Sequence, residues 1–230
     1  MTRGCFVTGT DTEIGKTLVS TGLLHALRQQ GLSALGMKPV AAGTTLKNGQ
    51  LANDDVNAII AASSKKVDRA LVNPYLFNPP IAPHIAAAEA NVAIDAAHIV
   101  ECFGKLAAMA DVVVVEGVGG FRVPLSEHAD TADLACALAL PVILVVGLRL
   151  GCINHALLTA EAIRARGLHC IGWVANQVDS TMAKPAENIA TLDTWLDMPR
   201  LGSIEYLAEP AANTVASRLQ LPHEWLSTIR

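Results

Sequence analysis

The stretch "GTDTEIGKTLVST", residues 9–21, decides the fold, because it places a glycine loop between an apolar run and a helical pattern. The run "CFVT" at residues 5–8 predicts a strand, and the pattern from Lys16 to Gln30 predicts a helix that ends at Gly31. A helix that opens from such a loop presents unpaired backbone N–H groups, and phosphate binds there. Five residues separate the two glycines, so the loop is one residue longer than the usual phosphate-binding loop.

The residues of this loop suit a nucleotide. Gly9 and Gly15 would let the backbone curl around phosphates, and Lys16 would reach the β- and γ-phosphate oxygens. The Thr17 hydroxyl would bind Mg²⁺. Gly-Lys-Thr also occurs by chance, and a tight turn with a lysine at a helix start is the alternative. The strand before the loop and the helix after it favour nucleotide binding.

Strand-like and helical patterns alternate along the chain. Further strands are predicted at residues 33–40, 111–116, 141–148 and 169–177, and Asn154 is predicted to cap a helix that runs to Arg166. This alternation predicts an α/β fold: one doubly wound, mostly parallel sheet with helices on both faces, as in P-loop NTPases. No linker divides the chain, so we expect one domain over residues 1–230. The proline-rich segment 47–94 is predicted to leave the sheet and help to form a site.

Composition excludes several classes of function. The net charge is −4 and no basic run occurs, which argues against nucleic acid or an anionic membrane as a partner. The longest apolar run, residues 138–148, is broken by proline and glycine and is too short for a membrane span. No signal-peptide pattern begins the chain. The five cysteines are scattered without a C-x-x-C pair, so free thiols in a reducing cytoplasm are expected, with no zinc cluster.

Acidic side chains near the predicted strand ends are candidate metal ligands, because Mg²⁺ prefers hard oxygen ligands. Glu116 ends the valine run and precedes "GVGG", which places it near the phosphate loop. The pair Asp54-Asp55 is a second candidate, although an exposed acidic pair at a helix start explains it equally well. Lys38 closes the second predicted strand. It is either a solvated strand end or a second cation for phosphate or an anionic intermediate.

Two further stretches could contact ligands. "GLRLGCINHALLT", residues 147–159, opens a second helix whose N-terminus could hold a carboxylate, with Asn154 as an added donor. His155 there and His84 in "APH" could act in a site, but such histidines more often pack or hydrogen-bond. The amide of Asn176 in "ANQVD" could pair with a base edge. The pattern is also similar to the N-K-x-D guanine reader, so adenine and guanine both remain possible.

Five motifs together resemble the dethiobiotin synthetases, enzymes of the biotin pathway. They occur in order as "FVTGTDTEIGKT", "KPVAAG", "VVVEGVGG", "PVILVVGLRLGCINHALLT" and "GWVAN", and the resemblance runs from residue 5 to about residue 205. The long loop of that family is this same G-x₅-G-K-T. The resemblance implies conversion of 7,8-diaminononanoate, CO₂ or bicarbonate and the co-substrate ATP into dethiobiotin, ADP and phosphate. It implies a carbamate, a carbamic–phosphoric mixed anhydride and a Mg²⁺ ion.

The resemblance also implies a role for individual residues. Catalysis would use Lys16 and Lys38. ATP would be bound by Glu13, Ile14, Gly15, Lys16, Thr17, Asp55, Glu116 and Asn176, and Mg²⁺ by Thr17, Asp55 and Glu116. The diamine would be bordered by Thr12, Glu13, Lys38, Ala42 and Gly119. In a homodimer, the substrate carboxylate would cross to Gly151, Cys152 and Asn154 of the partner.

Two positions depart from the family pattern. Family members often carry serine where Ala42 stands, and some carry a tyrosine near Asn188, so the affinity for the diamine and its tail is open. The alternative class is a switch ATPase of the partitioning or metal-carrier type, built on the same sheet. Those proteins usually carry an extra lysine near the first glycine, and positions 10–14 hold none.

Overall fold

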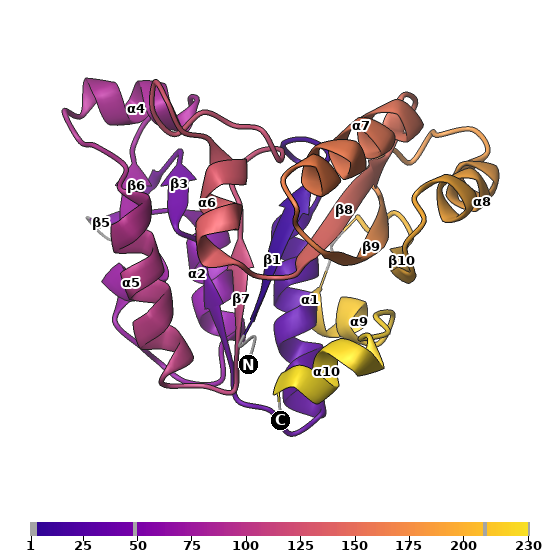
Figure 1. The fold of residues 1–230 in the computed structure, drawn as a ribbon, viewed down its shortest axis with the longest axis horizontal. Helices are drawn as coiled ribbons and strands as arrows, with labels where there is room; N and C mark the ends of the chain where they lie inside the picture. The colour runs from indigo at the N-terminus through magenta and orange to yellow at the C-terminus, as the bar shows by residue number, and fades with distance from the viewer. Residues whose placement is uncertain (1–3, 48–49, 209–210, 230) are drawn as a thin grey trace.

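The computed structural model describes residues 4–47, 50–208 and 211–229. Its centre is a sheet of six strands in the order β10-β9-β8-β1-β7-β2, and every neighbouring pair is parallel (Figure 1). The strands are β1 (Gly4–Gly9), β2 (Ala34–Met37), β7 (Val112–Glu116), β8 (Val142–Leu148), β9 (Cys170–Gln177) and β10 (Arg200–Ile204). The chain first crosses outward from β1 and later returns to its other side at β8. The predicted doubly wound topology is therefore confirmed.

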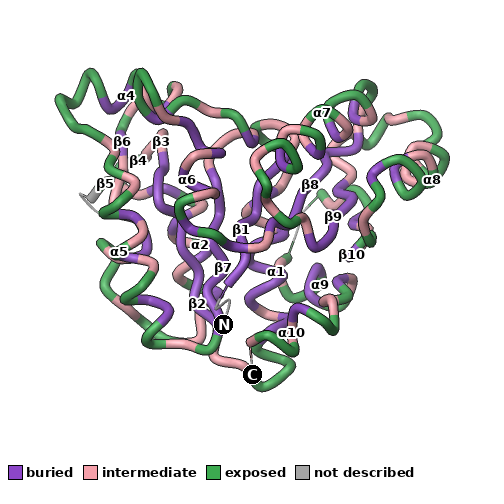
Figure 2. The backbone as a smooth tube through the Cα atoms, viewed as in Figure 1, coloured by how far each residue is buried: buried purple, intermediate pink, exposed green. Residues whose placement is uncertain are grey.

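Helices cover both faces of this sheet. One face carries α1 (Lys16–Gln29), α2 (Asp54–Ala62), α9 (Ala212–Ala216) and α10 (His223–Ile229). The other carries α5 (Ala96–Ala107), α6 (Thr131–Leu138), α7 (Cys152–Ala165) and α8 (Pro185–Trp195). Along β1, Cys5 and Val7 pack on the α1 side and Phe6 packs on the opposite side. Because both faces are covered, the central strands are mostly apolar and form the buried centre of the molecule (Figure 2).

Two predicted element boundaries are wrong. The predicted strand 33–40 splits, because β2 ends at Met37 and the chain turns through Lys38 and Pro39 into β3 (Val40–Ala42). Strand β3 leaves the main sheet and pairs in parallel with β6 (Tyr75–Phe77). Proline has no N–H for a ladder, so the run cannot continue in the sheet through it. The Lys38 side chain is left at the carboxyl edge of β2.

The start of α7 also differs from the prediction. Gly151 is the N-cap with φ of 93°, and Cys152 is the first helical residue, so Asn154 lies inside the first turn and is not the cap. Glycine adopts this left-handed conformation without a clash from a Cβ atom. Asparagine is a favoured cap in an extended conformation, and that preference misled the prediction.

The segment between β3 and α5 leaves the main sheet, as expected for residues 47–94, but it is folded rather than irregular. It contains the antiparallel pair β4 (Thr45–Lys47) and β5 (Gln50–Ala52), then α2, α3 (Arg69–Val72), β6 and α4 (Pro83–Glu89). Residues 48 and 49 lie outside the described residues. The Asn53 side chain accepts from Val56 N and donates to Gly43 O at 2.7 Å. This cap fixes the start of α2 beside the end of β3.

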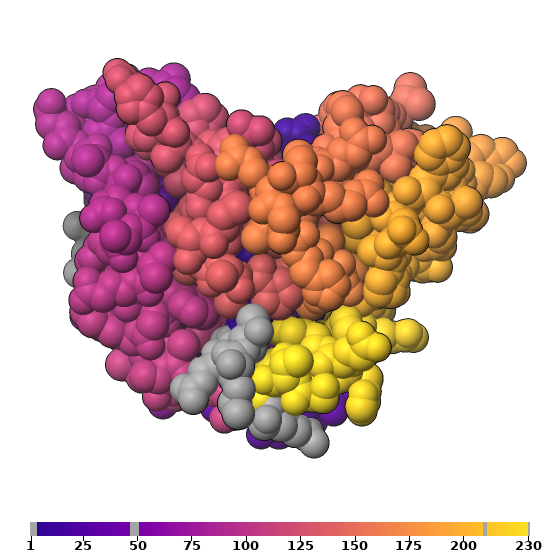
Figure 3. Space-filling model, viewed as in Figure 1, coloured from indigo at the N-terminus to yellow at the C-terminus, as the bar shows by residue number. Residues whose placement is uncertain are grey.

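The carboxyl edge of the sheet is hollowed. Figure 3 shows a notch between the magenta segment around α4 and the orange segment of α7, with indigo N-terminal residues at its floor. Among the residues that the structure describes, no helix is both long and apolar enough to cross a membrane. Ligands of open α/β sheets bind at this edge, so we expect a ligand-binding site there.

Candidate nucleotide-binding site

The loop between β1 and α1 is seated tightly on the sheet. Glu13 and Gly15 are left-handed, with φ of 58° and 84°, and Gly15 is the N-cap of α1. Ile14 is buried against the end of β8, where a Cβ atom on Gly147 would lie 2.4 Å from Ile14 Cγ2. Gly147 therefore permits the close approach that anchors the loop. The predicted strand, loop and helix are all present.

Asp11 organises the loop in a way that sequence reasoning missed. Thr12 N donates to Asp11 Oδ1 at 2.7 Å, and Lys16 Nζ donates to the Asp11 carbonyl at 2.7 Å. The Asp11 carboxylate also forms an ion pair with Arg149, which follows β8. The adjacency of β1 and β8 could have suggested this pair, because both residues follow those strand ends. Burial, and then the charge of Lys38, lower the pKa of Lys16 to about 8.

Strand alternation sets the direction of Glu116. Val112 and Val114 of β7 pack on the α1 side, whereas Val113 and Val115 pack on the opposite side. The next residue, Glu116, therefore points toward the start of α1. It is fully buried there, and Thr17 Oγ1 donates to its Oε1 at 2.8 Å.

A buried lysine joins the acidic residues. Lys38 Nζ lies 2.5 Å from Glu116 Oε1 and 3.2 Å from Asp55 Oδ2, and it donates to the Gly117 carbonyl at 3.2 Å. Lys38 is only 3% exposed. Burial alone would lower the pKa of Lys38, but the negative charges of Glu116 and Asp55 outweigh it and raise the pKa above its usual value. The Lys38 ammonium therefore stays charged and compensates both acids.

The two residues of the acidic pair Asp54-Asp55 lie in different surroundings. Asp55 faces Lys38 and the cavity, whereas Asp54 is exposed. Glu116 Oε2 is buried without a hydrogen-bond partner among the described residues. This oxygen, the Asp55 carboxylate and the Thr17 hydroxyl form a set of hard oxygen donors, which fits Mg²⁺. No group of three or more His, Cys, Asp or Glu side chains that could hold a metal occurs in the described ranges.

A cavity of about 820 Å³ unites most of the predicted site. It is lined by loop residues 12–13 and 15–17 and by Lys38, Ala42, Asp55, Glu116 and Gly119. Asn53 and Pro80–Pro83 of segment 47–94 also line it, as expected of that segment, whereas sequence reasoning missed Val118 and Val123. A cavity of about 900 Å³ lies at the opposite edge of the sheet, beside Pro141 and Trp225. It is lined by none of the predicted site residues.

Asn176 lies outside this cavity but touches the loop. Its Nδ2 donates to the Ile14 carbonyl at 2.8 Å, and the residue is 5% exposed. The prediction that Asn176 also reads adenine therefore rests on its amide oxygen and its second N–H. Ile204 pairs with Asn176 in register, so the loop after β10 starts beside it and brings the exposed ring of Tyr206 to this edge.

The predicted tail site also lies outside the cavity. Gly151 and Asn154 are exposed at the N-terminus of α7. Cys152 is buried, and its Sγ lies 4.0 Å from Asn188 Oδ1, so Asn188 borders this turn. His155 is exposed, and His84 does not line the cavity. The five cysteines are free thiols, as expected.

A parallel sheet whose glycine loop presents a lysine and a threonine at a helix N-terminus defines a P-loop nucleotide-binding protein. A family model described as an AAA domain matches residues 3–214. An ATP-dependent dethiobiotin synthetase of Janthinobacterium sp. (strain Marseille) is 56% identical over 222 residues, which cover 95% of this chain and 94% of that protein. The dethiobiotin synthetase of Ralstonia nicotianae is 54% identical over 94% of this chain and 95% of that protein. The chain belongs to the dethiobiotin synthetase family and is a ligase.

Solved structures agree on the fold alone. MinD of Pyrococcus horikoshii OT3, solved with Mg-ADP, has a TM-score of 0.54 at 15% identity, over 89% of this chain and 82% of that one. A ParA family ATPase of Chlorobium tepidum TLS has a TM-score of 0.53 at 13% identity, over 90% and 84%. These neighbours include the partitioning type that was the alternative class. The sheet does not separate the two classes, whereas the sequence relatives do.

The charge balance around Lys38 predicts a stability effect. Lys38→Met should destabilise the protein by about 3–5 kcal/mol, because it leaves the buried Glu116 carboxylate without its cation. The double variant Lys38→Met/Glu116→Gln should recover most of that loss, since both charges are gone. Urea unfolding measures all three proteins, with Lys105→Met in an exposed pair with Glu101 as a control that should change little. Equal losses in the single and double variants would contradict the account.

Proposed function

We propose that this chain closes the ureido ring of dethiobiotin from 7,8-diaminononanoate, CO₂ and ATP, and releases ADP and phosphate. The observation that carries the proposal is the single cavity that holds the phosphate loop, two buried lysines and two carboxylates. The high identity to dethiobiotin synthetases over nearly the whole chain supports it independently. A switch ATPase would need neither a diamine substrate nor a cavity wall that contacts a diamine.

The proposed chemistry suits these residue types. One substrate amine adds to CO₂ and loses a proton, which gives a carbamate. A carbamate oxygen then attacks the γ-phosphorus, ADP leaves, and a carbamic–phosphoric mixed anhydride forms. The second amine attacks its carbonyl carbon and expels phosphate. The protein needs no nucleophile of its own, so its task is to hold two anions in line for reaction.

Lys16 and Lys38 would provide most of the positive charge for these anions. Lys16 lines the cavity at the helix start, and phosphate oxygens would replace the Asp11 carbonyl as its partner. Lys38 borders the same cavity, so its ammonium can stabilise the carbamate. Thr17, Asp55 and Glu116 would hold Mg²⁺, which neutralises phosphate charge when bound. Asn176 would contact the adenine edge.

The diamine would lie along Thr12, Glu13, Ala42 and Gly119, which line the cavity. Ala42 offers no hydroxyl there. The tail carboxylate would bind at Gly151–Asn154 of a partner subunit, with Asn188 beside that turn. Two features support a homodimer: the turn lies exposed outside the cavity of its own chain, and Leu150 beside it is 96% exposed. A covering subunit would bury this side chain.

The first test is ADP release with and without diaminononanoate and bicarbonate. ADP release should require both, because the γ-phosphate has no acceptor until the carbamate forms. Lys16→Ala should abolish turnover and weaken ATP binding, whereas Lys105→Ala, an exposed lysine on α5, should leave both unchanged. ADP release that is equally fast without the diamine would overturn the proposed reaction and favour a switch ATPase.

The second test concerns the composite site. Lys16→Ala disables the loop half and Gly151→Glu blocks the tail turn, so each variant alone should be inactive. Subunit exchange should restore partial activity, since the heterodimer contains one site with an intact loop and an intact turn. Exchange of Lys16→Ala with Lys38→Met is the matched control and should restore none, because both changes lie in the same half. No recovery in the first mixture despite proven exchange would contradict the cross-subunit tail site.

A further inference from the structure

The loop that follows β7 forms one wall of the cavity. Val118, Gly119 and Val123 of this loop line it. Gly119 is left-handed, with φ of 64°, and a Cβ atom there would lie 2.9 Å from Val123 Cγ2 and 3.6 Å from Thr12 Oγ1. The Val123 side chain therefore packs against Gly119, and Gly119 lies beside Thr12, which would border the diamine in the proposed function. A shift of the Val123 side chain would therefore change the width of the cavity beside this wall.

Thr131 holds this wall through its buried hydroxyl and its backbone N–H. Thr131, the first residue of α6, is 1% exposed. Its Oγ1 accepts from Val123 N at 3.0 Å and donates to the Phe121 carbonyl at 2.6 Å. The Thr131 N–H also donates to the Val123 carbonyl at 2.9 Å. Thr131 does not line the cavity, so any influence on a ligand must pass through the loop residues that it contacts.

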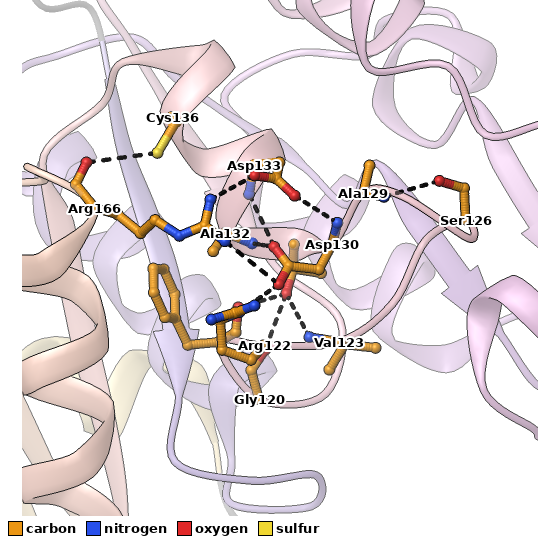
Figure 4. Close-up of polar contacts among 12 residues, drawn as sticks. Gly120, Arg122, Val123, Ser126, Ala129, Asp130, Ala132, Asp133, Cys136 and Arg166 are labelled. Carbon is orange, nitrogen blue, oxygen red and sulfur yellow. Dashed lines mark hydrogen bonds and ion pairs between the residues drawn. The ribbon is translucent and has the colours of Figure 1, made fainter.

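The start of α6 is itself anchored to distant elements. Asp130 Oδ1 accepts from Ala132 N at 2.8 Å and from Asp133 N at 3.0 Å, which completes a capping box. Asp130 also pairs with Arg122 of the loop, and Arg166 at the end of α7 pairs with Asp133 (Figure 4). Figure 4 shows Arg122 and Arg166 converging on Asp130 from two directions. Thr131, which binds the wall, is thus held in place by the capping box of α6 and by these ion pairs.

We propose that Thr131 is a positioning residue that holds Val123 and Gly119 at the spacing the diamine needs. This inference rests on the proposed function, because it takes the diamine as the occupant of that side of the cavity. The triphosphate would contact residues 15–17, which Thr131 does not touch. Loss of the hydroxyl should therefore affect the diamine more than ATP.

The test compares Thr131→Val with Thr131→Ser. Valine has the shape of threonine but leaves Val123 N and the Phe121 carbonyl without their partner. The KM for diaminononanoate should rise about tenfold, because the wall loses both of these hydrogen bonds, while kcat and the KM for ATP change less than about twofold. Serine keeps the hydroxyl and should restore the KM. Equal KM values for wild type and Thr131→Val would overturn the positioning role.

A matched control separates positioning from general damage. Ser63 Oγ likewise accepts from a backbone N–H, of Gly36 at 3.0 Å, and donates to the Ile59 carbonyl at 2.9 Å, but it lies away from the cavity. Ser63→Ala should lower the melting temperature and leave the diamine KM unchanged. A raised KM in Ser63→Ala would mean that any loss of stability produces the effect, which contradicts the proposal.

A second variant covers the case in which Thr131→Val does not fold. Val123→Ala keeps the hydrogen bonds of Thr131 and removes the apolar face of the wall, so it should raise the diamine KM in the same selective way. An unchanged KM would contradict the proposal. If wild-type protein releases no ADP in response to the diamine, the proposed function itself fails, and this outcome is distinct from the failure of any variant.

Discussion

The ion pair between Lys38 and Glu116 is the interaction on which the site depends. A fully buried carboxylate is costly unless it is compensated, and here the Lys38 ammonium and the Thr17 hydroxyl share that task, while Asp55 pairs with the same lysine. These partners come from the end of β2, the start of α1 and the start of α2. Together with Glu116 at the end of β7, they bring four chain segments to one point at the sheet edge. Lys38 also holds the Asp55 and Glu116 carboxylates together, where they could bind the metal that accompanies a triphosphate.

The sequence predicts the parts of this site that local patterns control. Lys16 and Thr17 follow from the glycine loop, and Glu116 follows from the end of a valine run. The choice of Asp55 over Asp54 does not, because it depends on how the Asn53 cap orients α2. The resemblance to a family favoured Asp55, and the structure places that carboxylate beside Lys38.

Other features depend on tertiary contacts that no local pattern contains. The pairing of Arg149 with Asp11 joins the ends of two strands that are far apart in the chain. The hydroxyl of Thr131 reaches back to Val123 across a loop whose shape is set by Gly119. The two wrong boundaries have local causes. The turn at Pro39 ends the strand that was predicted to continue to Val40, and Gly151 caps α7 in place of the predicted Asn154. The fold class survived both errors, because strand and helix alternation determines it.

The central claim is that a carbamate and the γ-phosphate of ATP react with each other in the cavity beside the phosphate loop. The oxygen atoms of the released phosphate test it most directly. Turnover with C¹⁸O₂, stopped before the label exchanges with water, gives a doubly labelled carbamate, one oxygen of which passes to phosphorus. Mass spectrometry should find one ¹⁸O in the released phosphate and one in the ureido carbonyl of dethiobiotin. Unlabelled phosphate alongside labelled dethiobiotin would contradict the claim, because the phosphoryl group would then have passed to water.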